Sequence, residues 1–150
     1  SFSLYGERVG ALSIVTESKE ETARVLSQVK RVIRTNYSNP PTHGATIVAA
    51  VLNSPELRAQ WEEELAEMRV RIKGMRQQMV ERLANNPAGQ DFSFVGRQSG
   101  MFSYSGLTKE QVIRLRTEYS IYAIETGRIC VAALNSGNVD YVADAIAKVL

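Results

Sequence analysis

The first third of the chain alternates short apolar stretches with rigid turns. Residues 9–16 (VGALSIVT) are apolar and rich in β-branched side chains, which predicts a strand. Ser18 and Glu21 have the spacing of a capping box, so we expect a helix to begin there. Apolar residues spaced three and four apart predict its buried face: Val25, Leu26, Val29, Val32 and Ile33.

Two further helices are expected before residue 90. The segment 36–41 (NYSNPP) predicts a rigid turn, and the Ala- and Val-rich stretch 44–52 predicts a buried helix. Ser54 followed by Pro55 marks the start of a long helix. Its apolar stripe consists of Trp61, Leu65, Met68, Ile72, Met75 and Met79. A coiled coil is one interpretation of that stripe, but a long amphipathic helix bridging two structural units is favoured.

The pattern changes after Asp91. Phe92 and Phe94 alternate with polar neighbours, and residues 100–104, 121–124 and 129–132 resemble short strands. Thr108 and Gln111 predict a second capping box, with Val112, Leu115 and Tyr119 facing inward. Ser136 is expected to cap a last helix whose apolar face is Val139, Val142, Ile146 and Val149.

These elements predict an α/β chain made of two parts. Residues 54–150 are expected to form the long helix and a small α+β domain, in which helices flank a small sheet. Residues 1–53 are expected to be the trailing strand and helices of another domain, because a lone strand needs partners. The opening Ser1-Phe2-Ser3, without Met, is typical of an excised fragment.

Composition excludes several classes of protein. The chain is 44% hydrophobic and 23% charged, with a net charge of +2, and its basic residues are spread out, which argues against nucleic-acid binding. No run suits a membrane span and no signal peptide precedes the first helix, so a cytoplasmic protein without membrane contact is expected. The single cysteine, Cys130, is expected to be inert core, and His43 to be a turn or helix-cap residue. One histidine and one cysteine favour no metal site.

Arginine chemistry is the more informative feature. The chain has 13 Arg and 5 Lys, and the planar guanidinium suits two-point contacts with carboxylate and phosphate. Arg8, Arg34 and Arg128 stand beside glycines, turns or apolar segments rather than on polar helix faces. Anion binding and internal ion pairs, with Glu7 or Glu125 as partners, explain these positions equally well.

Four segments stand out in order along the chain: residues 3–10 (SLYGERVG), 34–41 (RTNYSNPP), 100–107 (GMFSYSGL) and 127–132 (GRICVA). Together they resemble the aspartate and aromatic-amino-acid aminotransferases, which depend on pyridoxal phosphate. The resemblance covers essentially the whole chain and implies that it is the C-terminal part of such an enzyme. Residues 1–53 would then be the end of the cofactor-binding large domain.

The resemblance also implies roles for individual residues. Arg8 would grip the cofactor phosphate, and Arg128 would hold the substrate α-carboxylate beside Phe102. Arg34, on a loop shaped by residues 37–39, would reach the side-chain carboxylate of a substrate in the neighbouring subunit of a homodimer. The expected substrates are an amino acid, aspartate or an aromatic one, and a 2-oxo acid such as 2-oxoglutarate.

The Schiff-base lysine of the family would lie upstream of Ser1. The lysines present here occupy helix starts or polar helix faces: Lys19, Lys30, Lys73, Lys109 and Lys148. None has the apolar surroundings that activate an imine-forming lysine, so this chain by itself is expected to be inactive. The alternative interpretation is a non-enzymatic α+β module whose Met-bearing long helix binds a partner helix.

Overall fold

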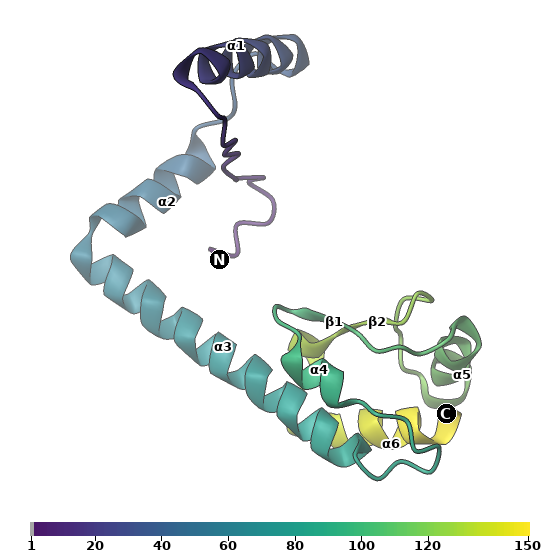
Figure 1. Cartoon of the computed structure of the whole chain (residues 1–150). Coiled ribbons are helices and arrows are strands. Elements are labelled where there is room, and N and C mark those ends of the chain that lie inside the picture. The colour runs from purple at the N-terminus through teal and green to yellow at the C-terminus, as the bar shows by residue number, and fades with distance from the viewer. Residues whose placement is uncertain (1) are drawn as a thin grey trace. The chain divides into compact units, whose positions relative to one another are not determined.

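A computed structural model describes residues 2–150 of the chain. These divide into two compact units, Ser1–Glu63 and Glu64–Leu150 (Figure 1). The described helices include none that is long and apolar enough to cross a membrane.

The first unit contains α1 (Lys19–Asn36), α2 (His43–Asn53) and the start of α3 (Pro55–Leu83). The Ser18 side chain accepts a hydrogen bond from the backbone N–H of Glu21, at 3.1 Å, and so caps α1 as predicted. Ser54 does the same for α3, through the N–H of Leu57 at 3.4 Å. In the second turn of α3, the ring of Trp61 stacks on the ring of Phe2, with 4.7 Å between the two ring centroids.

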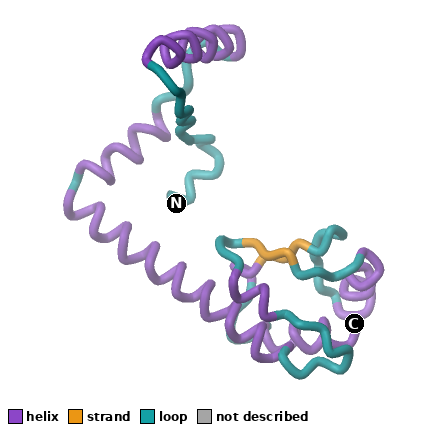
Figure 2. Tube along the Cα trace, in the orientation of Figure 1, coloured by secondary structure: helices purple, strands orange, loops and turns teal. Residues whose placement is uncertain are grey.

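The strand predicted at residues 9–16 is wrong. This segment is extended loop (Figure 2) and belongs to no sheet. A strand requires a neighbouring strand to share its backbone hydrogen bonds. The described residues of the first unit contain no strand that could pair with this segment. Residues 9–16, rich in β-branched side chains, therefore form an extended segment that does not pair with another strand.

The predicted burial of α1 and α2 is also wrong. No residue of α1 is buried, and Leu26 and Val32 are 49% and 66% exposed; in α2 only Gly44 is buried. The helices form where the apolar spacing predicts them, but the described residues cover their apolar faces only in part: Val25, Val29 and Ile33 are half-buried. Local spacing sets which face is apolar, whereas burial depends on what packs on it.

The second unit is built around one hydrophobic core. It comprises the rest of α3, then α4 (Ser93–Arg97), β1 (Phe102–Tyr104), α5 (Lys109–Tyr119), β2 (Arg128–Cys130), a 3₁₀ turn (Val131–Ala133) and α6 (Val139–Val149). Met79 and Leu83 of α3 are fully buried in the core with Val112, Leu115 and Ile146. The expected small sheet flanked by helices is present, as two antiparallel strands.

Two segments of the second unit differ from prediction. Phe92 and Phe94 flank the start of the short helix α4 rather than lying in a strand, because Asp91 caps the N–H of Ser93 at 2.7 Å. Residues 121–124 are loop, since the N–H of Ile121 closes the end of α5 on the carbonyl of Leu115. This leaves β2 with a single partner strand.

Two smaller expectations also fail. Cys130 is exposed rather than core, because the two-stranded sheet leaves its outer face uncovered. The last helix is preceded by Asn138 instead of Ser136, and the Asn138 side chain accepts from the N–H of Asn135 at 2.8 Å.

Candidate functional site

Arg128 and Phe102 lie side by side on the two-stranded sheet. The strands pair Tyr104 with Arg128 and Phe102 with Cys130. The guanidinium carbon of Arg128 lies 4.9 Å from the centroid of the Phe102 ring, within the range of a cation–π contact. Both side chains are exposed. The sheet therefore presents a positive group on an aromatic face, and the expected proximity of the two residues is present.

Gly127 fixes the backbone just before Arg128. Its φ is +84°, and a Cβ at this position would lie 2.8 Å from the carbonyl oxygen of Leu107. The Gly127 carbonyl also accepts from the N–H of Ser105 at 2.9 Å and from its hydroxyl at 2.7 Å. A side chain is thus excluded at residue 127, and Arg128 leaves the loop in a defined direction.

The carboxylate of Glu125 is used elsewhere. It pairs with Lys109 at 3.0 Å and with Arg116 at 3.4 Å, and the Lys109 hydrogen bond is the main cause that lowers the pKa of Glu125. None of the ion pairs in the described chain includes Arg128. Of the two alternatives left open by sequence, the internal ion pair with Glu125 is therefore absent.

Arg8 occupies a strained turn in the first unit. Its φ is +52°, and the turn is closed by the N–H of Glu7 donating to the carbonyl of Leu4 at 3.2 Å. The exposed guanidinium donates to the carbonyl of Tyr5 at 3.3 Å and lies 5.4 Å from that ring's centroid. Glu7 pairs instead with His43, at 3.0 Å. Arg8 is therefore in no ion pair within the described residues.

His43 and Gly44 hold this turn against the start of α2. A Cβ on Gly44 would lie 2.2 Å from Cγ2 of Val9 and 2.8 Å from Cβ of Glu7. Only glycine permits this approach. His43, expected to be a turn or helix-cap residue, is instead the first residue of α2, whose N-cap is Thr42, and its ring pairs with Glu7.

Arg34 lies in the last turn of α1 and is exposed. Its guanidinium donates to the hydroxyl of Ser38, whose φ of +70° turns the chain back toward the helix end. The N–H groups of Tyr37 and Ser38 both donate to the carbonyl of Ile33. The rigid turn predicted from the two prolines is therefore also tied to the helix by hydrogen bonds.

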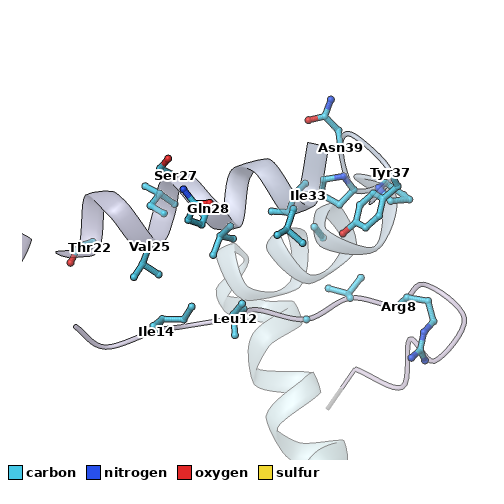
Figure 3. A pocket seen from close by; sticks show the side chains of 18 of the residues that line it. Arg8, Leu12, Ile14, Thr22, Val25, Ser27, Gln28, Ile33, Tyr37 and Asn39 are labelled. Atoms are coloured by element: carbon cyan, nitrogen blue, oxygen red, sulfur yellow. The ribbon is translucent and has the colours of Figure 1, made fainter. Parts of the chain in front are cut away.

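A mostly apolar groove of about 2030 Å³ lies in the first unit, between the extended segment and α1 (Figure 3). Leu12 and Ile14 lie opposite Val25 and Ile33, with Arg8 at one end. The groove is wide and lined largely by aliphatic side chains. This lining suits protein side chains better than a small polar ligand.

The structure thus brings Arg128 and Phe102 together, and it places Arg8 and Arg34 in the other unit. Arg76, which is buried and bonded to the backbone carbonyl of Phe102, was not predicted from the sequence to matter for the site. Arg76 lies four residues after Ile72 and three before Met79, on the apolar stripe of α3. The position of an arginine on the apolar stripe of a helix was the feature of the sequence that could have indicated its burial.

Exposed arginines beside an aromatic ring or a glycine-fixed backbone are typical of sites that bind small anions such as carboxylates and phosphates. The sequence model of the family "Aminotransferase class I and II" matches residues 1–146. The chain belongs to this family. Its α/β class agrees with that of solved members.

Individual members are similar over the whole chain. The aspartate aminotransferase of Pseudomonas aeruginosa is 73% identical over 150 residues, which are all of this chain and 38% of that protein. The aromatic-amino-acid aminotransferase of Escherichia coli is 52% identical over 149 residues, or 99% of this chain and 38% of that protein. The chain therefore spans less than two-fifths of the relatives that it matches.

Solved structures show the same likeness. An aromatic-amino-acid aminotransferase from Burkholderia pseudomallei, covalently bound to pyridoxal phosphate, superposes with a TM-score of 0.87 at 71% identity, covering 99% of this chain and 37% of that one. An aromatic aminotransferase from Psychrobacter, cocrystallised with aspartic acid, also gives 0.87, at 48% identity, covering 98% and 37%. These likenesses do not favour a non-enzymatic interaction module.

Proposed function

We propose that this chain is the C-terminal part of an enzyme that transfers an amino group between an amino acid and a 2-oxo acid. The observation that carries the proposal is the Arg128–Phe102 pair, which offers uncommitted guanidinium donors on an exposed sheet. Charge-assisted two-point bonding to a carboxylate would both bind and orient the α-carbon. Aspartate, aromatic amino acids and 2-oxoglutarate are the proposed substrates.

Pyridoxal phosphate is the proposed cofactor. Arg8 fits its phosphate, because the exposed guanidinium has one hydrogen bond to Tyr5 and no ion pair among the described residues. When bound, the cofactor withdraws electrons from the substrate's α-carbon, which makes loss of its proton easier. Arg8 would anchor the phosphate, while Arg128 would fix the carboxylate and Phe102 would cover one side of the substrate.

Arg34 is proposed to serve the neighbouring subunit of a homodimer. It is exposed at the end of α1, and within the described residues its guanidinium bonds to a single hydroxyl, that of Ser38. That contact can be exchanged for a side-chain carboxylate, whose negative charge is a stronger partner. Substrates with two carboxylates would use Arg34, and aromatic substrates would have to displace it.

The apolar faces of α1 and the groove beside it support the assignment to a longer chain. We propose that residues 1–53 complete a cofactor-binding large domain and that residues 54–150 form the long helix and the small domain. Side chains of the remaining large domain would fill the groove. A cytoplasmic location accompanies this proposal.

The experiment is an assay of the full-length protein, purified with pyridoxal phosphate. We expect transfer of the amino group from aspartate to 2-oxoglutarate, and phenylalanine serves as a second donor to compare specificity. A protein that holds the cofactor but transfers no amino group from either donor would refute the proposal.

A further inference from the structure

A buried arginine, Arg76, lies beneath the sheet that carries Phe102. Its side chain is 3% exposed, on the face of α3 that packs into the second unit. The ion pairs of the described chain do not include it. A guanidinium buried without a carboxylate carries a desolvation cost, and burial lowers the pKa of Arg76. Its neutral partners must therefore compensate.

Those partners all belong to the segment that leads into and through β1. One terminal nitrogen donates to the Val95 carbonyl at 3.2 Å and to the Ser103 hydroxyl. The other donates to the carbonyls of Gly100, at 2.6 Å, and Phe102, at 3.0 Å. Four of the five guanidinium donors are thus used, and the acceptors are separated from Arg76 by 19 to 27 residues.

The Phe102 ring depends on this backbone for its position. The ring is 48% exposed, so packing does not hold it firmly. β1 has three residues and a single partner strand, an arrangement that is marginal without further support. Arg76 supplies that support from below, through the carbonyl of Phe102 itself. The Arg128 guanidinium in turn rests over the same ring.

We propose that Arg76 is a positioning residue, which holds β1 so that Phe102 and Arg128 are set for the substrate carboxylate. The expected change in KM rests on the proposed function. The expected support of β1 by Arg76 does not depend on that function. The planar fork is required, because an ammonium has three donors that point from one atom and cannot reach four acceptors in a plane.

The test uses the full-length protein with Arg76→Gln and Arg76→Lys. Arg114→Gln is the matched control, because Arg114 also donates to distant carbonyls, of Val149 at 3.2 Å and Lys148 at 3.4 Å. Arg114 also pairs with Glu118 on its own helix, at 2.8 Å, and none of these bonds touches β1 or β2. The control therefore measures what losing an arginine's hydrogen bonds and ion pair away from the sheet does to the unit.

Two readouts decide the outcome. We expect Arg76→Gln to raise KM for both aspartate and 2-oxoglutarate about tenfold, with a smaller fall in kcat, and Arg76→Lys to recover part of the loss. Amide hydrogen exchange in residues 100–104 and 128–132 should become about tenfold faster in Arg76→Gln and stay unchanged in Arg114→Gln. If Arg76→Gln does not fold, Arg76→Lys carries both measurements.

The inference is overturned if KM and exchange in Arg76→Gln match those of the Arg114→Gln control. It is also overturned if only the melting temperature falls. If the unsubstituted protein transfers no amino group, the proposed function is refuted on its own. Hydrogen exchange in β1 and β2 then decides whether Arg76 holds these strands.

Discussion

At the scale of single residues, Arg128 is the side chain on which the proposed function depends. In the full-length protein we expect Arg128→Ala to lower kcat/KM by on the order of a hundredfold or more, because two charge-assisted bonds of about 1.5–3 kcal/mol each would be lost. The free energy of unfolding should change little, since Arg128 is exposed and in no ion pair of the described chain. Steady-state kinetics and urea unfolding of one variant measure both quantities.

Arg128→Lys is the control for charge. It should recover part of the activity, because an ammonium keeps the charge but not the two-point geometry. A variant Arg128→Ala that unfolds more easily while keeping a near-normal KM for aspartate and 2-oxoglutarate would show a structural role instead, and would end the assignment of Arg128 to the substrate.

Gly44 is the second residue for which the structure gives a specific prediction. An added Cβ would meet Val9 Cγ2 at 2.2 Å and Glu7 Cβ at 2.8 Å, so Gly44→Ala must displace the turn that carries Arg8. We expect a loss of about 1–3 kcal/mol in the free energy of unfolding, the usual range for overpacking. Weaker binding of pyridoxal phosphate by the full-length protein should accompany it.

Gly10→Ala provides the matched control, because a Cβ there meets nothing within 4 Å and lies on the same extended segment. Cofactor titration followed by absorbance, together with urea unfolding, compares the two variants. Equal affinity and equal stability in both would mean that the Gly44 contact does not position Arg8.

At the scale of elements, Glu125 ties the loop between α5 and β2 to α5. Lys109, and then Arg116, lower the pKa of its carboxylate in the folded chain. A lowered folded-state pKa stabilises the fold above the unfolded value, about 4.3 for glutamate, and that stabilisation disappears as pH falls through the folded pKa. We expect Glu125→Gln to be less stable than the unsubstituted chain at pH 7.

The two proteins should approach equal stability below pH 4. Urea unfolding at several pH values measures the difference, and Arg58, paired with Glu62 on α3, offers a control pair through Glu62→Gln. A difference between the unsubstituted chain and Glu125→Gln that stays constant from pH 7 to pH 3 would show that the ion pairs do not stabilise the loop.

Helix starts were the best-predicted features at this scale. Thr108 and Gln111 form the full capping box, with bonds of 3.2 Å and 2.8 Å in the two directions. A cap joins residues three apart, so the sequence contains every participant. Strands were predicted less well, because a strand such as residues 9–16 exists only if a distant segment pairs with it.

At the scale of the whole molecule, we expect the 150-residue chain to transfer no amino group when pyridoxal phosphate is supplied. All five lysines are exposed: Lys19, Lys30, Lys73, Lys109 and Lys148. An amine that attacks the cofactor needs surroundings that favour its uncharged form, and solvent favours the charged form. Assays with aspartate and 2-oxoglutarate, and borohydride reduction followed by peptide mass mapping, test this expectation.

The full-length protein is the positive control for both measurements. Diffuse, partial labelling of several surface lysines of the short chain agrees with the expectation. Turnover by the short chain, with reduction fixing the cofactor on a single one of its lysines, would contradict it.

The sequence by itself determined the family, the longer helices and the capping residues Ser18, Ser54 and Thr108, because these rest on motifs and on hydrogen bonds between near neighbours. It also singled out Arg128 and Phe102, whose proximity the structure confirms. The roles of Arg8, Arg34, Phe102 and Arg128 in binding remain predictions.

Only the tertiary structure decided which apolar faces are covered, which strands pair and what Arg76 does. Leu26 and Val32 have the spacing of buried residues and are exposed, whereas Arg76 is a charged residue and is buried. Burial and pairing depend on segments far apart in the chain, as the sequence separation of 26 between Arg76 and Phe102 illustrates. A local pattern shows which face of an element is apolar, and only the packing of distant segments determines whether that face meets protein or water.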